Sequence, residues 1–158
     1  MKIVAFVLLS FALLNASPVS EGNKFFANGD YGKALESYLS ARKENPAEPA
    51  LFYNIGTCQY MLGNYEDAIK ELEPAVRFPD SSLAAKAAYN LANAYFRSGE
   101  KAESATKIEA WRQSIAYLKK AIELVPNYEK AKKNIEIVQR RLKEALDERI
   151  NGNWEYVG

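Results

Sequence analysis

The chain has 158 residues, a formal net charge of +1, and 48% hydrophobic residues. This composition fits one ordinary globular domain or one short helical repeat array. The near-neutral charge offers no basic stripe, so nucleic acid is not an expected partner. The chain contains no histidine, which removes Ser-His and Cys-His nucleophilic machinery and the commonest transition-metal ligand. We therefore expect a protein that is not an enzyme, with no metal site and no cofactor.

The first sixteen residues, MKIVAFVLLSFALLNA, are typical of a secretory signal peptide. Lys2 gives a short positive start, and residues 3–14 form an apolar run that is short for a membrane span. We expect cleavage after Ala16, although Leu14 is larger than the residue usually found at that site. An uncleaved anchor or a first core helix are the alternatives. The pattern predicts export to the periplasm or the cell envelope.

A motif then recurs along the chain. It reads PVSEGNKFFANGDY at residues 18–31, FYNIGTCQYMLGNY at 52–65 and AYNLANAYFRSG at 88–99. Gly29 and Gly63 are 34 residues apart, and the next glycine of the series, Gly99, follows after 36. A period of this size is typical of an α-helical solenoid.

The residues within each period resemble the tetratricopeptide repeat (TPR), with its pattern W-x2-L-G-x2-Y, A-x3-F and P. Matching positions are small residues where helices meet, alanine or serine on the second helix, and a closing proline: Gly22, Gly56, Ala92, Ala34, Ala68, Ser114, Pro46, Pro79 and Pro126. The resemblance implies an all-α TPR solenoid of three helix-turn-helix hairpins plus a C-terminal capping helix. We assign a signal peptide at 1–16, a TPR domain at 17–150 and a tail at 151–158. The repeats are expected at about 15–47, 48–81 and 82–127, with the capping helix at 128–150.

The first two hairpins are regular, and we expect their helices at 19–27, 31–43, 48–62 and 65–76. In the third, Pro126 comes about ten residues later than regular repeats allow. We therefore expect helices at 82–97 and 106–125 joined by an expanded polar loop at about 100–109, with Thr106 and Glu109 as a capping box. Gly29, Gly63 and Gly99 are expected at the turns between helices, where a positive φ favours glycine.

The last helix is expected at 127–146 because Asn134-Ile135 repeats Asn54-Ile55 and Asn90-Leu91. Its cationic residues, interpreted as a solvated face rather than a binding surface, are Lys130, Lys132, Lys133, Arg140, Arg141 and Lys143. Asn151-Gly152 predicts a turn into the tail. The single cysteine, Cys58, is expected to be a buried apolar residue. The densest acidic group, at helical spacing and so expected to be a solvated face, is Glu66, Asp67, Glu71 and Glu73.

In TPR families the first helix of each pair lines a concave, ligand-binding groove. The candidate groove residues of this chain are Asn23, Phe26, Ala27, Tyr53, Asn54, Thr57, Tyr60, Lys86, Tyr89, Asn90, Asn93, Phe96 and Arg97. Rings supply contact area with little loss of entropy, and amides can bond an extended backbone. The set predicts a non-catalytic protein–protein interaction scaffold that binds a peptide or protein segment. The alternative is that some rings pack beneath the tail or a neighbouring helix.

One TPR subfamily binds C-terminal carboxylates through lysines, asparagines and an arginine. Asn23, Asn54 and Lys86 match that clamp, but Val19 stands at a lysine position and Asn90 at the arginine position. The clamp is therefore incomplete, and binding of chaperone tails is not predicted.

The signal-like start, the expanded third repeat and the sequence YEKAKKNIEIVQRRLKE at 128–144 resemble the TPR proteins of bacterial aerotolerance (Bat) operons. This resemblance implies membrane proteins with von Willebrand A domains as partners. Two alternatives stay open, namely self-assembly through Trp154 and Tyr156 of the tail, and a role as accessory subunit of a membrane enzyme complex. The sequence leaves the oligomeric state open.

Overall fold

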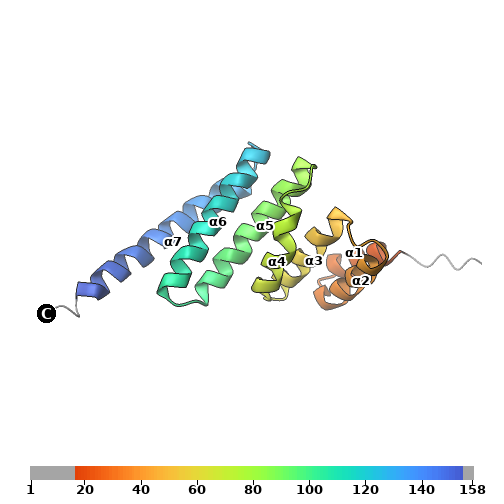
Figure 1. The fold of residues 1–158 in the computed structure, drawn as a ribbon, viewed down its shortest axis with the longest axis horizontal. Coiled ribbons are helices and arrows are strands. Elements are labelled where there is room, and N and C mark those ends of the chain that lie inside the picture. The colour runs from red at the N-terminus through yellow and green to blue at the C-terminus, as the bar shows by residue number, and fades with distance from the viewer. Residues whose placement is uncertain (1–16, 155–158) are drawn as a thin grey trace, which may run out of the picture.

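The computed structural model describes residues 17–154, and every regular element in that range is an α-helix. The seven helices are α1 (Pro18–Ala27), α2 (Tyr31–Glu44), α3 (Pro49–Met61), α4 (Tyr65–Ala75), α5 (Ser81–Glu100), α6 (Ser104–Leu124) and α7 (Glu129–Trp154). Helices α1–α2, α3–α4 and α5–α6 form three hairpins that stack in chain order, with α7 at the far end (Figure 1). The predicted all-α solenoid with a terminal helix is confirmed. The expected signal peptide, Tyr156 and the side chain of Trp154 lie outside the described residues.

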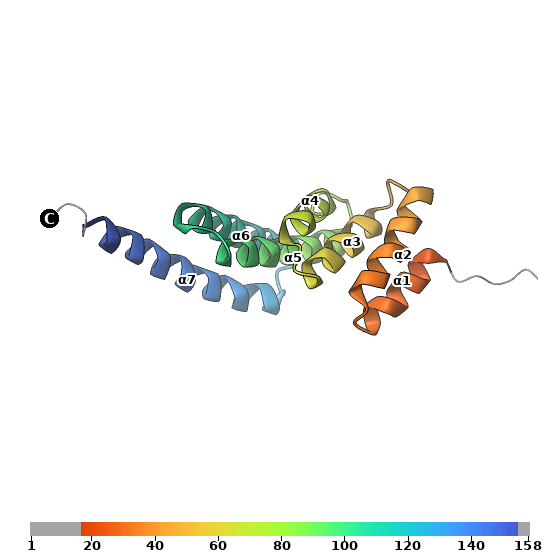
Figure 2. The ribbon, with the colours of Figure 1, turned by 90° about the horizontal axis from the view of Figure 1, so that it is seen from below.

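The helices form two layers. Seen from below, α4 and α6 lie along one side of the stack, and α5 and α7 lie along the other (Figure 2). We call the side carried by α1, α3, α5 and α7 the inner face. None of the described helices is long and apolar enough to cross a membrane.

The first two hairpins turn through the same hydrogen-bonded motif. Gly29 and Gly63 have φ values of +82° and +81°, a conformation that side chains with a Cβ rarely adopt. The residue after each glycine donates its N–H to a carbonyl five residues back, as Asp30 does to Phe25 and Asn64 does to Gln59, both at 2.9 Å. This bond closes the end of the helix. The two predicted glycine turns are therefore confirmed.

The third hairpin turns differently. Three expectations about it are wrong, namely the expanded loop, the capping box and the turn at Gly99. Helix α5 continues through Gly99 to Glu100, and α6 begins at Ser104, so the expanded loop at 100–109 is absent. Thr106 lies inside α6, and the N-cap of that helix is Glu103, without a side-chain cap bond. The additional residues instead lengthen both helices. Trp111 stands at the position of Tyr31 and Tyr65, which begin α2 and α4. Ile108 is buried one turn before it, so the apolar stripe of α6 starts one turn earlier than those of α2 and α4.

Gly99 permits close packing instead of making a turn. A Cβ built on it would lie 2.8 Å from both Cδ1 and Nε1 of Trp111. The Trp111 Nε1 group donates to the Phe96 carbonyl at 3.0 Å, which holds the indole in place. Gly56 has the same role against Leu72, and Gly22 against Tyr38, each with a Cβ contact of 2.6 Å. Glycine is thus required at each of these three positions because a large side chain of the partner helix packs directly against the backbone there.

The core consists of three buried clusters in chain order, one at each stacking level. The first joins α1, α2 and α3 and includes Cys58, whose side chain is fully buried. Burial raises the pKa of the Cys58 thiol to about 11, as expected for a structural cysteine. The second cluster joins α3, α4 and α5, and the third joins α5, α6 and α7. Each hairpin is therefore stabilised by its neighbour, which is the energetic pattern of a solenoid.

Helix α7 has the faces of a cap. Ala131, Val138 and Ala145 are buried against the third cluster. Glu136 occupies the position in α7 that Gly56 occupies in α3, two residues after the asparagine of the repeat. Its side chain is exposed. The side on which a further helix would pack is thus polar. The expected turn at 151–152 is wrong, because α7 runs to Trp154. An Asn-Gly pair tolerates a positive φ but does not require one.

Gly99→Ala should lower the free energy of unfolding by about 1 kcal/mol, because overpacking against Trp111 outweighs the gain in helix propensity. The control is Gly32→Ala in α2, where a Cβ meets nothing within 4 Å. That change should leave stability equal or slightly higher. Urea unfolding followed by circular dichroism measures both, and equal stabilities for the two variants would contradict the close-packing role.

Ser114→Ala should leave the free energy of unfolding unchanged or raise it by about 0.5–1 kcal/mol. The Ser114 hydroxyl is fully buried and has no hydrogen-bond partner in the part of the chain that the structure describes. The equivalent residues of the first two hairpins are Ala34 and Ala68. Thermal unfolding compares the variant with the wild type. A loss above about 1 kcal/mol would mean that the hydroxyl has a partner in solution.

Candidate functional site

The candidate groove residues all come from α1, α3 and α5, three of the helices that carry the inner face. The rings of Phe26, Tyr53, Tyr60, Tyr89 and Phe96 are half-buried, and none of them is sealed in the core. The exposed members of the set are Asn23, Ala27, Lys86 and Arg97, the half-buried polar members are Asn54, Asn90 and Asn93, and Thr57 is 9% exposed.

A pocket of about 170 Å³ opens on this face between α1 and α3. We call it the α1–α3 pocket, and its lining residues are Asn23, Phe26, Ala27, Tyr38, Tyr53, Asn54 and Thr57. The lining combines two carboxamides, three hydroxyl groups and an aromatic ring from α1, and it contains no charged side chain. Such a surface can bury a neutral group and bond it at the same time.

Two of the asparagines hold neighbouring hairpins together rather than facing an open space. The carboxamide of Asn90 donates to Thr57 Oγ1 at 3.0 Å, linking α5 to α3. One repeat later, the carboxamide of Asn134 donates to Asn93 Oδ1 at 2.9 Å and to the Tyr89 hydroxyl at 3.2 Å, linking α7 to α5. Asn134 and Asn90 occupy equivalent positions, as do Asn93 and Thr57. The inner face therefore carries a repeated amide bond between successive helices.

The first interface breaks this series. Asn54 is equivalent to Asn90, and Asn23 would be its partner on α1. The Asn23 Oδ1 atom instead accepts from the Tyr38 hydroxyl at 2.7 Å. Burial raises the pKa of Tyr38 to about 12, so the phenol stays a donor through the physiological range. Within residues 17–151 the Asn54 side chain makes no hydrogen bond, and it lines the pocket with a donor and an acceptor uncommitted.

The aromatic candidates divide in the same way along the stack. The ring of Tyr89 lies 5.2 Å from that of Tyr128, and the ring of Phe96 lies 5.5 Å from that of Trp111. These two rings pack against neighbouring helices, as the alternative interpretation expected. Tyr53 lines the α1–α3 pocket.

The two positions that depart from the carboxylate clamp carry no charge. Val19 packs, partly buried, against the first core cluster. Asn90 is engaged with Thr57. Lys86 is exposed on α5 and does not line the α1–α3 pocket.

The acidic group on α4 serves contacts between hairpins and on the surface. Glu71 pairs with Arg42 at 2.6 Å, and Glu73 accepts from the Tyr95 hydroxyl at 2.9 Å. Within the described residues, no group of three or more histidine, cysteine, aspartate or glutamate side chains could hold a metal ion.

Three residues of the inner face were missed from the sequence. Tyr38 was not among the candidate groove residues, yet it lines the α1–α3 pocket from α2 and donates its hydroxyl to Asn23. Tyr128 and Asn134 were not expected on this face either. The sequence did contain a signal for Asn134, because Asn134-Ile135 repeats Asn54-Ile55 and Asn90-Leu91.

Comparison with known proteins places the fold. The family model described as "Tetratricopeptide repeat" matches residues 19–82. A small glutamine-rich tetratricopeptide repeat-containing protein of Mycosarcoma maydis is 29% identical over 132 residues, covering 84% of this chain. The chain spans 34% of the length of that relative.

Two solved structures are similar throughout the stack. The Sgt2 TPR domain of Aspergillus fumigatus has a TM-score of 0.69 at 25% identity, covering 82% of this chain and 80% of its own. The first TPR domain of Spaghetti (RPAP3), solved with the HSP90 peptide SRMEEVD, has a TM-score of 0.68 at 21% identity, covering 80% and 90%. Residues 19–82 therefore match the tetratricopeptide repeat family, and the seven described helices have the solenoid fold of TPR domains.

Proposed function

We propose that this protein is a non-catalytic interaction scaffold that binds a peptide segment along its inner face, with the α1–α3 pocket as the central contact. The observation that carries the proposal is the uncommitted carboxamide of Asn54, which lines a pocket with aromatic walls. The matching carboxamides of Asn90 and Asn134 are used to hold the stack together.

The chemistry of the pocket suits an extended peptide. Each backbone unit of an extended segment presents one N–H and one C=O, and a single carboxamide can accept from the first and donate to the second. Phe26 and Tyr53 line the same pocket and can cover a neutral side chain of the ligand. The hydroxyl of Tyr38 fixes Asn23 in place, so the pocket is ordered before the ligand arrives.

Similar structures support a peptide as the ligand class, since the RPAP3 domain was solved with the HSP90 peptide SRMEEVD. The lining of the α1–α3 pocket contains no cation that could neutralise a terminal carboxylate. Val19 and Asn90 also stand at two positions where the clamp has basic residues. We therefore expect recognition of an internal segment rather than a free C-terminus.

We also propose that the protein acts outside the cytoplasm or at the membrane, with proteins bearing von Willebrand A domains as partners. The leader-like residues 1–16 and the resemblance of residues 128–144 to Bat-operon TPR proteins support this. Fusing residues 1–30 to a reporter that is active only in the periplasm tests the export step.

Asn54→Ala should weaken peptide binding about tenfold, the equivalent of roughly 1.4 kcal/mol, and leave stability nearly unchanged. The test begins with selection on the wild type from a display library of short random segments fused at both ends, which presents no free carboxylate. Fluorescence anisotropy then measures the affinity of the best segment for each variant.

The control for this experiment is Asn90→Ala. Because Asn90 bonds Thr57, its removal should lower the free energy of unfolding by about 1 kcal/mol. If Asn54→Ala binds the selected segment as tightly as the wild type, the α1–α3 pocket is not the contact. If no segment is enriched over a library without protein, the scaffold function is wrong.

A further inference from the structure

The cations of the inner face follow the repeat. Lys86 stands four residues before Asn90, and Lys130 stands four residues before Asn134. The residue seven after each of these asparagines is again basic, Arg97 in α5 and Arg141 in α7. On α3, the corresponding positions around Asn54 hold Ala50 and Met61. The inner face is therefore neutral at the α1–α3 end and basic at the α5–α7 end.

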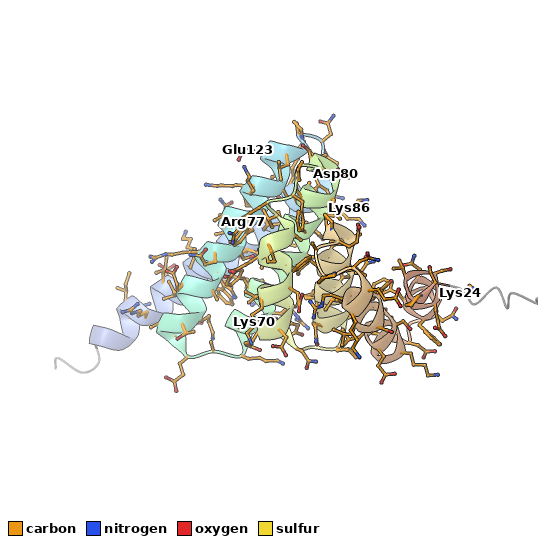
Figure 3. The ribbon with its side chains drawn as sticks, turned by 45° about the vertical axis from the view of Figure 1, so that its right-hand side comes forward. Lys24, Lys70, Arg77, Asp80, Lys86 and Glu123 are labelled. Carbon is orange, nitrogen blue, oxygen red and sulfur yellow. The ribbon has the colours of Figure 1, made fainter. Side chains whose placement is uncertain are left out.

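The hydrogen bonds of the two asparagines place both lysines on the inner face. Residues four apart share one side of a helix, so Lys86 lies on the side of α5 that carries Asn90. Lys130 likewise lies on the side of α7 that carries Asn134, which is bonded to α5. Both lysines are exposed. Figure 3 shows Lys86 near the Asp80 end of α5, well away from Lys24 on α1.

The two arginines and the two lysines differ in their ionic partners. Arg97 pairs with Glu100 at 2.7 Å, and Arg141 pairs with Glu144 at 3.7 Å. Among the described residues, Lys86 and Lys130 have no carboxylate within 4.0 Å. The charges of these two lysines are therefore available to a ligand.

The position of the lysines on α7 does not serve the stability of the helix. Lys130, Lys132 and Lys133 lie near its start, where the helix dipole disfavours cations. Lys132 is compensated through Glu129 at 3.0 Å, whereas no carboxylate of the described residues lies within 4.0 Å of Lys130 or Lys133. The local charge arrangement is thus unfavourable for the helix alone and favourable for an anionic ligand.

We propose that the α5–α7 end of the inner face binds the acidic part of the partner segment, with at least one carboxylate held between Lys86 and Lys130. The inference rests on the proposed function, in which the neutral part of the same segment occupies the α1–α3 pocket. The two ends of the face then fix the direction of the bound chain. A protein segment fits better than a membrane or nucleic acid, because the lysines continue the face that carries the neutral pocket and the chain as a whole has a charge of only +1.

The test compares two charge-matched double variants of the full chain. Lys86→Glu with Lys130→Glu reverses the inner lysines. Lys43→Glu with Lys119→Glu reverses two exposed lysines of α2 and α6, the second helices of their hairpins. Segments selected from the random, terminally fused library should be enriched in Asp and Glu. Their affinity should fall about tenfold in the inner variant and about twofold or less in the control, and raising the salt from about 0.1 M to about 1 M should remove the difference.

Replacing the acidic residues of a selected segment by Gln or Asn should give the same loss on the wild type and no further loss on the inner variant. Enriched segments without acidic residues, or equal affinities for both double variants, would overturn this inference and leave the scaffold function standing. Binding of phosphatidylserine vesicles or single-stranded DNA that depends on Lys86 and Lys130, without acidic enrichment among the peptides, would also overturn it. Failure to enrich any segment would overturn both.

Discussion

The inner face depends on one repeated interaction, the hydrogen bond from an asparagine carboxamide to the first helix of the preceding hairpin. Asn90 makes it to Thr57, and Asn134 makes it to Asn93. Each bond fixes how successive first helices lie against one another, since a partly buried carboxamide needs its partner. Asn54 lacks this bond because its expected partner, Asn23, accepts a hydrogen bond from the Tyr38 hydroxyl instead. One interface of the stack is therefore left with hydrogen-bonding capacity that the fold does not use.

The close helix contacts have a second, steric basis. Gly22, Gly56 and Gly99 each face a large side chain of the partner helix within their own hairpin. They bring the two layers together, while the asparagines set the spacing along one layer. Because the layers are fixed separately, side chains of the inner face can differ from repeat to repeat without disturbing the core. The change from a neutral end at α1–α3 to a basic end at α5–α7 shows this freedom.

The architecture could be predicted from the sequence because the repeat is marked by residues that act on the backbone at their own position. Gly29 and Gly63 mark turns through their φ angles, and the closing prolines mark the hairpins. Gly99 misled the prediction because a glycine required by a neighbouring tryptophan looks the same in sequence as one required by a turn. The prediction of a loop at 100–109 was wrong for a related reason. The length of the insertion does not indicate whether the added residues form a loop or extend the two helices beside it. The sequence could not show that Asn90 is hydrogen-bonded and Asn54 is not. That difference depends on the bond from Tyr38 to Asn23, two residues that are fifteen positions apart and lie in different helices.

The central claim is that Asn54 is free and Asn90 and Asn134 are bonded. Side-chain amide resonances of the protein in solution test this directly, through hydrogen exchange of the three carboxamides. The Asn54 amide protons should exchange rapidly in the free protein and become protected when a selected peptide is added, while those of Asn90 and Asn134 should be slow in both states. Slow exchange at Asn54 without ligand, or protection by the peptide only at Asn90 or Asn134, would contradict the account.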